Sequence, residues 1–422
     1  MRSGETGVPP PTTGPVRWAG FGPRHCRLLY WPKVDFVRPF PLSALAIAGF
    51  FLVGCTAAQK RIYTPDELRS ELETRVSTQM RDEIVIPFEI DDEIRQLALD
   101  VTRSAQTESA KMRAIVHTII GLAGFSVSYD RLSNKTAQEV FREGKGNCLA
   151  YSNLFVGMAR AAGLDAAYAD VRFTERITRE AEIVVHSTHI TAVVRQTTGN
   201  VLIDFTATPE RKYIGFDVID DLEAIANFYN NQGFLYGYFT ETEDVDFDPL
   251  EKELEMYRLA LEILPTFQRA RNNLGVALRR RGRVDEAIEQ YRLAIEQDPG
   301  YAEALSNLAT AYSYQGRTEE ALATYRLAAK HAGGDGYIHH RLGVMYLRVG
   351  RCPQAIKHFQ KAISREPELA DARYHLGECY RKLGKEKKAI EQFEAALEID
   401  PNYISARTRL EQLSASGGET PP

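Results

Sequence analysis

The spacing of apolar and polar residues changes within residues 65–215. Before Gly163 the apolar residues recur at helical spacing. After it, the segments AAYADVRF, EIVVHS, HITAVVR and VLIDFTA are short, β-branched and alternating, as in strands. Helices followed by an antiparallel sheet predict an α+β domain. The expected helices begin at Thr64-Pro65, a capping residue followed by proline, and cover residues 91–106 and 111–122.

The stretch FREGKGNCLAYSNLFVGMARAAGL, residues 141–164, predicts a loop that leads into a helix. Asn147 is a good N-cap, and Gly163 suits the position just after the last helical turn. Cys148 would then lie in the first turn, where the helix dipole and free N–H groups favour a thiolate. The loop glycines would allow a substrate to come close. One apolar stripe at helical spacing is expected on this helix, formed by Leu154, Phe155, Met158, Ala161 and Ala162.

A thiol nucleophile needs a base and a group that orients the base. His189 begins the segment HITAVV, and Asp204 lies in VLIDFT. The turn signal TTGN between them predicts a hairpin. With a loop centred on residues 197–198, Asp204 faces Thr191 and lies on the same side as His189. A bulge at Gly199 would change this register.

These segments resemble the transglutaminase-like superfamily, whose core is papain-like. The resemblance rests on GNCLAYSNLFVGMARAAGL, HITAVV and IDFT and covers about residues 110–210. It implies a catalytic Cys148, His189 and Asp204, in which the thiolate attacks an amide carbonyl and the imidazole moves the proton. The sequence departs from the family pattern at Thr191, where an aromatic residue is usual, and at Phe205, where proline is usual.

Other interpretations of these residues stay open at this point. Cys148 could be a small buried hydrophobic residue, His189 a hydrogen-bonded strand histidine, and Asp204 a cap at the end of a strand. His186 competes with His189 for the role of the base, although it is off the family spacing.

The C-terminal half is an internal repeat in which the same residue types recur at a constant step of about 34 residues. It resembles the tetratricopeptide repeat, a helix–turn–helix unit that stacks into an all-α solenoid. Four full repeats are expected over about residues 268–403, followed by a last helix to about residue 414. The recurring positions of the first repeat are Leu274, Gly275, Ala287, Tyr291 and Ala294. The polar residues expected to contact a protein or peptide partner are Arg269, Asn272, Arg279, Tyr337, His340 and Arg348.

A degenerate repeat with an insert is expected over residues 216–267. Tyr257, Ala260 and Pro265 each stand one repeat length before their equivalents in the first full repeat. The acidic run ETEDVDFD, residues 241–248, is the candidate insert. It is interpreted as a solvated loop, because no glycine or distal glutamate completes a calcium-binding pattern.

The N-terminus has the pattern of a targeting segment. Residues 41–54 are a continuous apolar run, too short for a membrane span and typical of a signal-peptide core. LVGC before Thr56 resembles the bacterial lipobox, which implies a lipid on Cys55. The absence of aspartate at Thr56 resembles outer-membrane sorting, with the protein facing the periplasm. Since the apolar run lies deep in the chain, the true start could lie near Val34.

The composition mainly indicates which partners and sites are not expected. The formal net charge of −5 does not suggest a nucleic-acid partner. The five cysteines form no CxxC pair and no zinc spacing, and no cofactor is expected. Cys352 and Cys379 are interpreted as structural or incidental. The expected organisation is a signal peptide region (1–54), a lipidated linker (55–64), a transglutaminase-like domain (65–215), a degenerate repeat (216–267), tetratricopeptide repeats (268–414) and a disordered tail (415–422).

Three functions fit this sequence. The first is an envelope-anchored Cys-His-Asp acyl-transfer enzyme, a peptidase or amidase if water accepts the acyl group and a cross-linking enzyme if an amine does. The second is a non-catalytic repeat scaffold that assembles an envelope complex. The third combines them, with the repeats recruiting a protein substrate.

Overall fold

The computed structural model describes residues 61–121, 128–130, 132–173, 189–196, 199–205, 213–238 and 248–416. These residues all belong to one compact unit. Cys55, His186, the segment EIVVHS and most of the acidic run 241–248 lie outside the described residues. Among the described residues, no helix combines the length and the apolar character that crossing a membrane requires.

The helices expected before the cysteine are confirmed, and each begins at a capping residue. Thr64 and Glu67 form a capping box at the start of α1 (Pro65–Arg75). Asp91 Oδ1 accepts a hydrogen bond from the Ile94 N–H, at 3.0 Å, where α2 (Asp92–Thr102) begins. The remaining early helices are the 3₁₀ helix η1 (Thr78–Glu83), α3 (Glu108–Gly121) and the unexpected α4 (Ala137–Glu143).

The central helix of this part is α5 (Cys148–Ala161). Asn147 Oδ1 caps it by accepting from the Ala150 N–H at 2.9 Å, and Gly163 follows it with φ of 77°, as expected. The expected apolar stripe is largely buried, but burial is not limited to it, because every residue from Cys148 to Ala159 is buried. Its polar side chains are hydrogen-bonded instead: Asn153, for example, donates to the Lys135 carbonyl and accepts from the Tyr168 hydroxyl.

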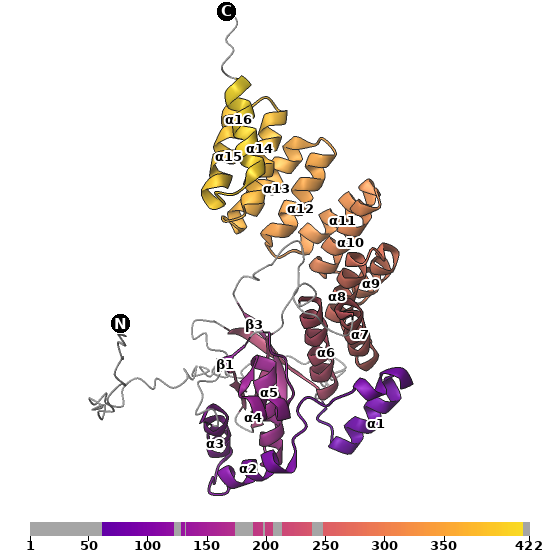
Figure 1. Cartoon of the computed structure of the whole chain (residues 1–422), viewed down its shortest axis with the longest axis vertical. Helices are drawn as coiled ribbons and strands as arrows, with labels where there is room; N and C mark the ends of the chain where they lie inside the picture. The colour runs from indigo at the N-terminus through magenta and orange to yellow at the C-terminus, as the bar shows by residue number, and fades with distance from the viewer. Residues whose placement is uncertain are drawn as a thin grey trace, which may run out of the picture. The chain divides into compact units, whose positions relative to one another are not determined.

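A four-stranded antiparallel sheet in the order β5-β4-β3-β6 packs against α5 (Figure 1). Its strands are β3 (Ala166–Phe173), β4 (His189–Gln196), β5 (Gly199–Ile203) and β6 (Tyr213–Ile219). Strands β3 and β4 match the expected AAYADVRF and HITAVVR, whereas β5 overlaps the expected VLIDFTA but begins two residues earlier and ends at Ile203. The fourth, β6, was not expected, and it pairs with β3, so the sheet runs past the boundary placed at residue 215. A short parallel pair, β1 (Ser128–Tyr129) and β2 (Lys145–Gly146), lies just before α5.

The next two helices, α6 (Asp221–Tyr238) and α7 (Pro249–Ile263), pack on each other as a repeat would. A Cβ placed on Gly233 would lie 2.7 Å from the ring of Tyr257. The same contact, at 2.6 Å, joins Gly275 to Tyr291 in the first full repeat. In both pairs a missing side chain lets the aromatic ring fill the space between two helices.

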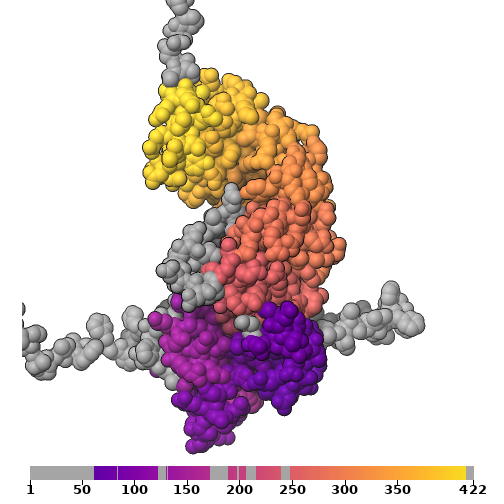
Figure 2. Space-filling model, turned by 45° about the vertical axis from the view of Figure 1, so that its right-hand side comes forward, coloured from indigo at the N-terminus to yellow at the C-terminus, as the bar shows by residue number. Residues whose placement is uncertain are grey.

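Nine further helices follow in sequence order (Figure 1), and in Figure 2 they form a continuous series from orange to yellow. They comprise four helix pairs and a last helix, as expected. Their bounds are α8 (Gln268–Arg280), α9 (Val284–Gln297), α10 (Ala302–Tyr314), α11 (Thr318–His331), α12 (Gly336–Arg348), α13 (Cys352–Arg365), α14 (Ala370–Lys382), α15 (Glu386–Ile399) and α16 (Ile404–Ser416).

The hydrophobic core of the sheet domain does not stop where the repeats were expected to begin. One apolar cluster extends from Leu68 in α1 through α5 and the sheet to Ile263 in α7 and Ala270 in α8. The α+β part and the first helices after it therefore share a core.

Candidate functional site

Cys148 is the first residue of α5 and is 9% exposed. Its position follows from the Asn147 cap, which fixes where the helix begins. The loop glycines before it have structural roles. Gly144 ends α4 with φ of 67°, and a Cβ on Gly146 would lie 2.8 Å from the Ala150 side chain. Gly144 therefore serves backbone turning and Gly146 helix packing, while substrate approach over this loop stays a prediction.

His189 and Asp204 meet at the end of the hairpin formed by β4 and β5. The pairs Gln196 with Gly199 and Ala192 with Ile203 give the register that a loop at 197–198 predicts. One further step puts Asp204 opposite Thr191. The imidazole Nε2 of His189 lies 2.9 Å from Asp204 Oδ1, and both side chains are largely buried.

The same imidazole also interacts with the Cys148 side chain. Burial by itself disfavours the charged ring and lowers its pKa. The hydrogen bonds and negative charges of Asp204 and Cys148 outweigh this effect and raise the pKa of His189 to about 9. Near neutral pH the ring is therefore an imidazolium between a carboxylate and the sulfur, and it can stabilise a thiolate or give up a proton.

Phe205 holds the segment that carries Asp204. Its ring centroid lies 5.8 Å from that of Tyr151 and 6.1 Å from that of Phe155, both on α5. The Thr191 hydroxyl also donates to the Ile203 carbonyl, next to Asp204. The two positions that depart from the family pattern thus contribute to placing the carboxylate. The sequence offered no signal for this, because Phe205 and α5 lie far apart along the chain.

Two cavities of this part lie away from the cysteine. One of about 670 Å³ lies beside α1 and α4, and charged residues such as Arg69, Arg142 and Glu139 line it. Another of about 400 Å³ lies between the α1 region and the back of α5, near Tyr63 and Gly157. No group of three histidine, cysteine or acidic side chains suited to a metal ion occurs in the part of the chain that the structure describes.

The expected role of Asn272 in partner binding is wrong, because this residue is buried between the repeats. Its side chain is 1% exposed, and its Oδ1 accepts from Asn307 Nδ2 at 2.9 Å. Its own Nδ2 lies 3.4 Å from Oδ1 of Asn273, whose Nδ2 donates to Asn230 Oδ1 at 2.9 Å. This chain of buried amides joins helices of successive units, so Asn272 holds the repeats together and is not accessible to a partner.

Two of the expected partner contacts are arginines with ionic or polar partners inside the chain. Arg269 forms an ion pair with Asp170 of β3. Arg348 donates to the Ser313 hydroxyl at 2.6 Å. Arg269 therefore joins the first repeat to the sheet, although Asp170 lies far earlier in the chain.

The other three expected contacts lie on the first helices of the repeats. The Arg279 guanidinium lies 5.5 Å from the ring centre of Tyr314. His340 Nε2 lies 3.2 Å from Nδ1 of His375, and burial lowers the pKa of His340 to about 3, helped by the charges of His375 and Arg341. Tyr337 is half-buried. A role in partner binding stays a prediction for these residues.

Comparisons with known proteins divide the chain in the same way. A family model of the transglutaminase-like superfamily matches residues 95–207. Two models of the tetratricopeptide repeat match residues 267–332 and 340–404. None of the curated proteins matches the chain.

Among solved structures, the chain is similar to YrrB, a tetratricopeptide-repeat protein described as having an unusual peptide-binding site. The identity is 21% over 44% of this chain and 92% of that chain, with a TM-score of 0.35. A thermophilic repeat protein of Thermus thermophilus is 21% identical over 45% of this chain and 99% of its own, with a TM-score of 0.36. MamA of Desulfovibrio magneticus RS-1 is 19% identical over 41% of this chain and 97% of its own, with a TM-score of 0.34.

Likenesses of this size say nothing about function. The family matches, the caps, the sheet and the repeated glycine–aromatic contacts agree with one another. The chain carries a transglutaminase-like core domain followed by tetratricopeptide repeats.

Proposed function

We propose that this protein is a cysteine-dependent acyl-transfer enzyme with Cys148 as nucleophile, His189 as proton carrier and Asp204 as the residue that orients the imidazole. The observation that carries the proposal is the place of the His189 imidazole, which lies 2.9 Å from Asp204 Oδ1 and also interacts with the Cys148 side chain. A buried histidine that was only structural would not need both a thiol and a carboxylate as partners.

In the proposed reaction the Cys148 thiolate attacks the carbonyl carbon of an amide. The developing oxyanion is assigned to the backbone N–H of Cys148, at the start of α5. The His189 imidazolium gives its proton to the leaving amine, the C–N bond breaks, and a thioester forms on Cys148. The neutral imidazole then takes a proton from water, whose oxygen attacks the thioester and releases the acid.

Hydrolysis is proposed over cross-linking because water is abundant and no pocket for an acceptor amine is assigned. The repeats are proposed to recruit a protein substrate or partner, which tetratricopeptide repeats can do by presenting a stacked helical surface. The Arg269–Asp170 ion pair and the shared core support this combination, since they join the first repeat to the domain that carries Cys148.

A small reactive ester tests the chemistry without knowledge of the substrate. p-Nitrophenyl acetate should release nitrophenol in a burst and leave an acetyl group on Cys148, located by peptide mass mapping. Cys148→Ala should show no burst. His189→Gln should acylate more slowly and deacylate more slowly still. Acetylation spread evenly over the cysteines, with no effect of His189→Gln, would favour the scaffold function instead.

Envelope anchoring through a lipid on Cys55, at the outer membrane and facing the periplasm, is a separate proposal. It is supported by the apolar run before LVGC. Lipidation contributes about 0.8 kcal/mol per buried CH₂, so several acyl chains hold a protein firmly. Radiolabelled palmitate should enter the wild-type chain and not Cys55→Ser; equal labelling of the two would disprove the lipid site.

A further inference from the structure

Cys352 and Cys379 lie next to each other in the interior of the repeats. Cys352 is the first residue of α13, and Cys379 lies in the third turn of α14. The Cys352 side chain interacts with the Cys379 thiol. They are 4% and 0% exposed and belong to the same apolar cluster. The packed helices of successive repeats therefore bring two buried thiols close to each other.

The repeat itself explains why these two positions meet. The equivalent positions one repeat earlier in the chain are Thr318 and Met345. Two repeats earlier they are Val284 and Ala311. Met345 and Ala311 are buried in the same apolar cluster, and Val284 packs against it. The position pair thus recurs at each junction between repeats, and at the third junction both members are cysteine.

We propose that Cys352 and Cys379 form a disulfide that links the third and fourth repeats when the protein meets an organic disulfide as oxidant. The Cys352 thiolate attacks one sulfur of R–S–S–R and releases one thiolate, leaving a mixed disulfide on Cys352. The Cys379 thiolate then attacks the Cys352 sulfur, forms the internal S–S bond and releases the second thiolate. The two cysteines lose two electrons, the oxidant gains them, and the two cysteine protons pass to the released thiolates.

The surroundings of the pair set the rate of this reaction. Burial, and then the charge and hydrogen bond of Cys352, raise the pKa of Cys379 to about 12. Cys379 therefore stays a thiol near neutral pH, and the second step is expected to be slow there and faster at higher pH. Cys352 is the first to react in this scheme because it lies at a helix start and is the more exposed of the two.

The proposal does not depend on acyl transfer and is tested on the full chain. The folded protein is incubated with oxidised glutathione at pH 7 and pH 9, free thiols are then blocked with N-ethylmaleimide, and the chain is digested with trypsin without reductant. The expected product is the peptide Cys352–Lys357 joined to the peptide Tyr374–Arg381. It should form several-fold faster at pH 9 and disappear when dithiothreitol is added.

Unfolding provides the second measurement. In urea, the transition of the repeats should move to a higher midpoint after oxidation and return after reduction. Cys352→Ala and Cys379→Ala should each abolish the linked peptide and this redox-dependent shift, whatever their own effect on the midpoint. Formation of the linked peptide only in urea-unfolded protein, or of mixed disulfides without the internal link in folded protein, would overturn the proposal.

Discussion

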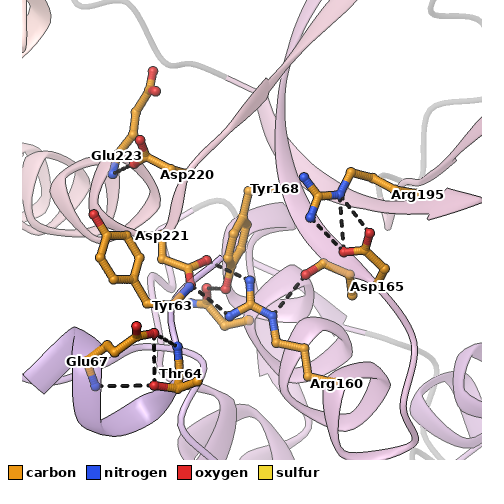
Figure 3. Close-up of polar contacts among 12 residues, drawn as sticks. Tyr63, Thr64, Glu67, Arg160, Asp165, Tyr168, Arg195, Asp220, Asp221 and Glu223 are labelled. Carbon is orange, nitrogen blue, oxygen red and sulfur yellow. Dashed lines mark hydrogen bonds and ion pairs between the residues drawn. The ribbon is translucent and has the colours of Figure 1, made fainter. Parts of the chain in front are cut away.

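Arg160 and Asp221 form a bidentate ion pair in the interior of the molecule. The two guanidinium nitrogens lie 2.6 Å and 3.0 Å from the two carboxylate oxygens, and Asp221 is 1% exposed. Arg160 Nε also donates to the Ala166 carbonyl, and the Tyr63 N–H donates to Asp221 (Figure 3). The pair therefore joins the end of α5 to β3, to the segment before α1 and to the start of α6.

Asp221→Asn should destabilise the folded chain by roughly 3 kcal/mol or more. The substitution leaves the largely buried Arg160 without a compensating charge, and breaking a buried pair costs far more than breaking an exposed one. The measurement is the urea midpoint of unfolding. Asp165→Asn is the matched control: it breaks the more exposed pair with Arg195 and should cost about 1 kcal/mol or less. Equal losses in the two variants would contradict this account.

The start of α5 and the pairing of β4 with β5 could be predicted because they depend on signals that are local in the sequence. The Asn147 cap, Gly163 and the TTGN turn each act within a few residues, so they fixed where α5 begins and how β4 pairs with β5. From that register the meeting of His189 and Asp204 follows. The repeats were predictable for another reason, since a pattern that recurs at a constant step reinforces itself with every unit.

The features that the sequence missed depend on partners far away in the chain. Asn272 has the polarity of a surface residue, yet Asn307 in the next repeat completes its hydrogen bonds and allows burial. Arg269 finds its partner, Asp170, in a strand of the preceding domain. Likewise, β6 is stabilised by pairing with β3, across a separation that its own residues do not indicate. Burial and charge pairing of this kind follow from the fold and not from spacing.

Gly343→Ala should destabilise the repeats by roughly 1–3 kcal/mol. A new Cβ would lie 2.6 Å from the ring of Phe359, which is fully buried and cannot move aside without disturbing the next helix. Helix propensity alone predicts that this substitution stabilises the protein, because alanine is more favourable than glycine in a helix by about 1 kcal/mol. A loss measured by thermal or urea unfolding thus reports the close helix contact.

Gly121→Ala serves as the control for that substitution. Gly121 is also helical, and a Cβ there meets nothing within 4 Å. It should be neutral or slightly stabilising. Were Gly343→Ala stabilising to the same degree, the packing of Phe359 against α12 would be wrong.

Acid should weaken the third repeat through His340 and His358. Burial lowers the pKa of His358 to about 4, helped by the charges of His339, Lys361 and Lys357, and that of His340 to about 3. In the unfolded chain both pKa values are near 6.5. At a pH between the folded and the unfolded pKa values, the unfolded chain binds more protons than the folded chain. The free energy of unfolding that these neutral histidines contribute is therefore fully present above pH 6.5 and is lost as the pH falls toward about 4.

The expected loss for His358 is roughly 1 kcal/mol, since its ring is only half-buried. Urea midpoints measured from pH 7 to pH 4 give the change of stability with pH, which is the slope to compare. His358→Phe keeps a ring that can stack on Tyr346, whose centroid lies 5.5 Å away, but removes the titrating group. This variant should lose less stability on acidification than the wild type. An unchanged slope would show that His358 is not responsible.

Cys148 should be alkylated faster than Cys352 and Cys379 by iodoacetamide at pH 6.5. Because the pKa of His189 is raised to about 9, the imidazolium faces the Cys148 sulfur at this pH and stabilises its negative charge. Peptide mapping over time identifies the thiol that reacts first. His189→Ala should slow the modification of Cys148 by about tenfold or more, since it removes the charged ring that the sulfur faces.

Asp204→Asn should slow the same reaction less than His189→Ala does. The amide can still hold the ring through its oxygen, 2.9 Å from Nε2 in the wild type, while the charge that favours the imidazolium is gone. His117→Gln is the control, a histidine on α3 outside the triad, and it should leave the rate unchanged. If Cys148 reacts no faster than Cys352, and His189→Ala changes nothing, the contact between thiol, imidazole and carboxylate is structural, and the repeats carry the function of the protein.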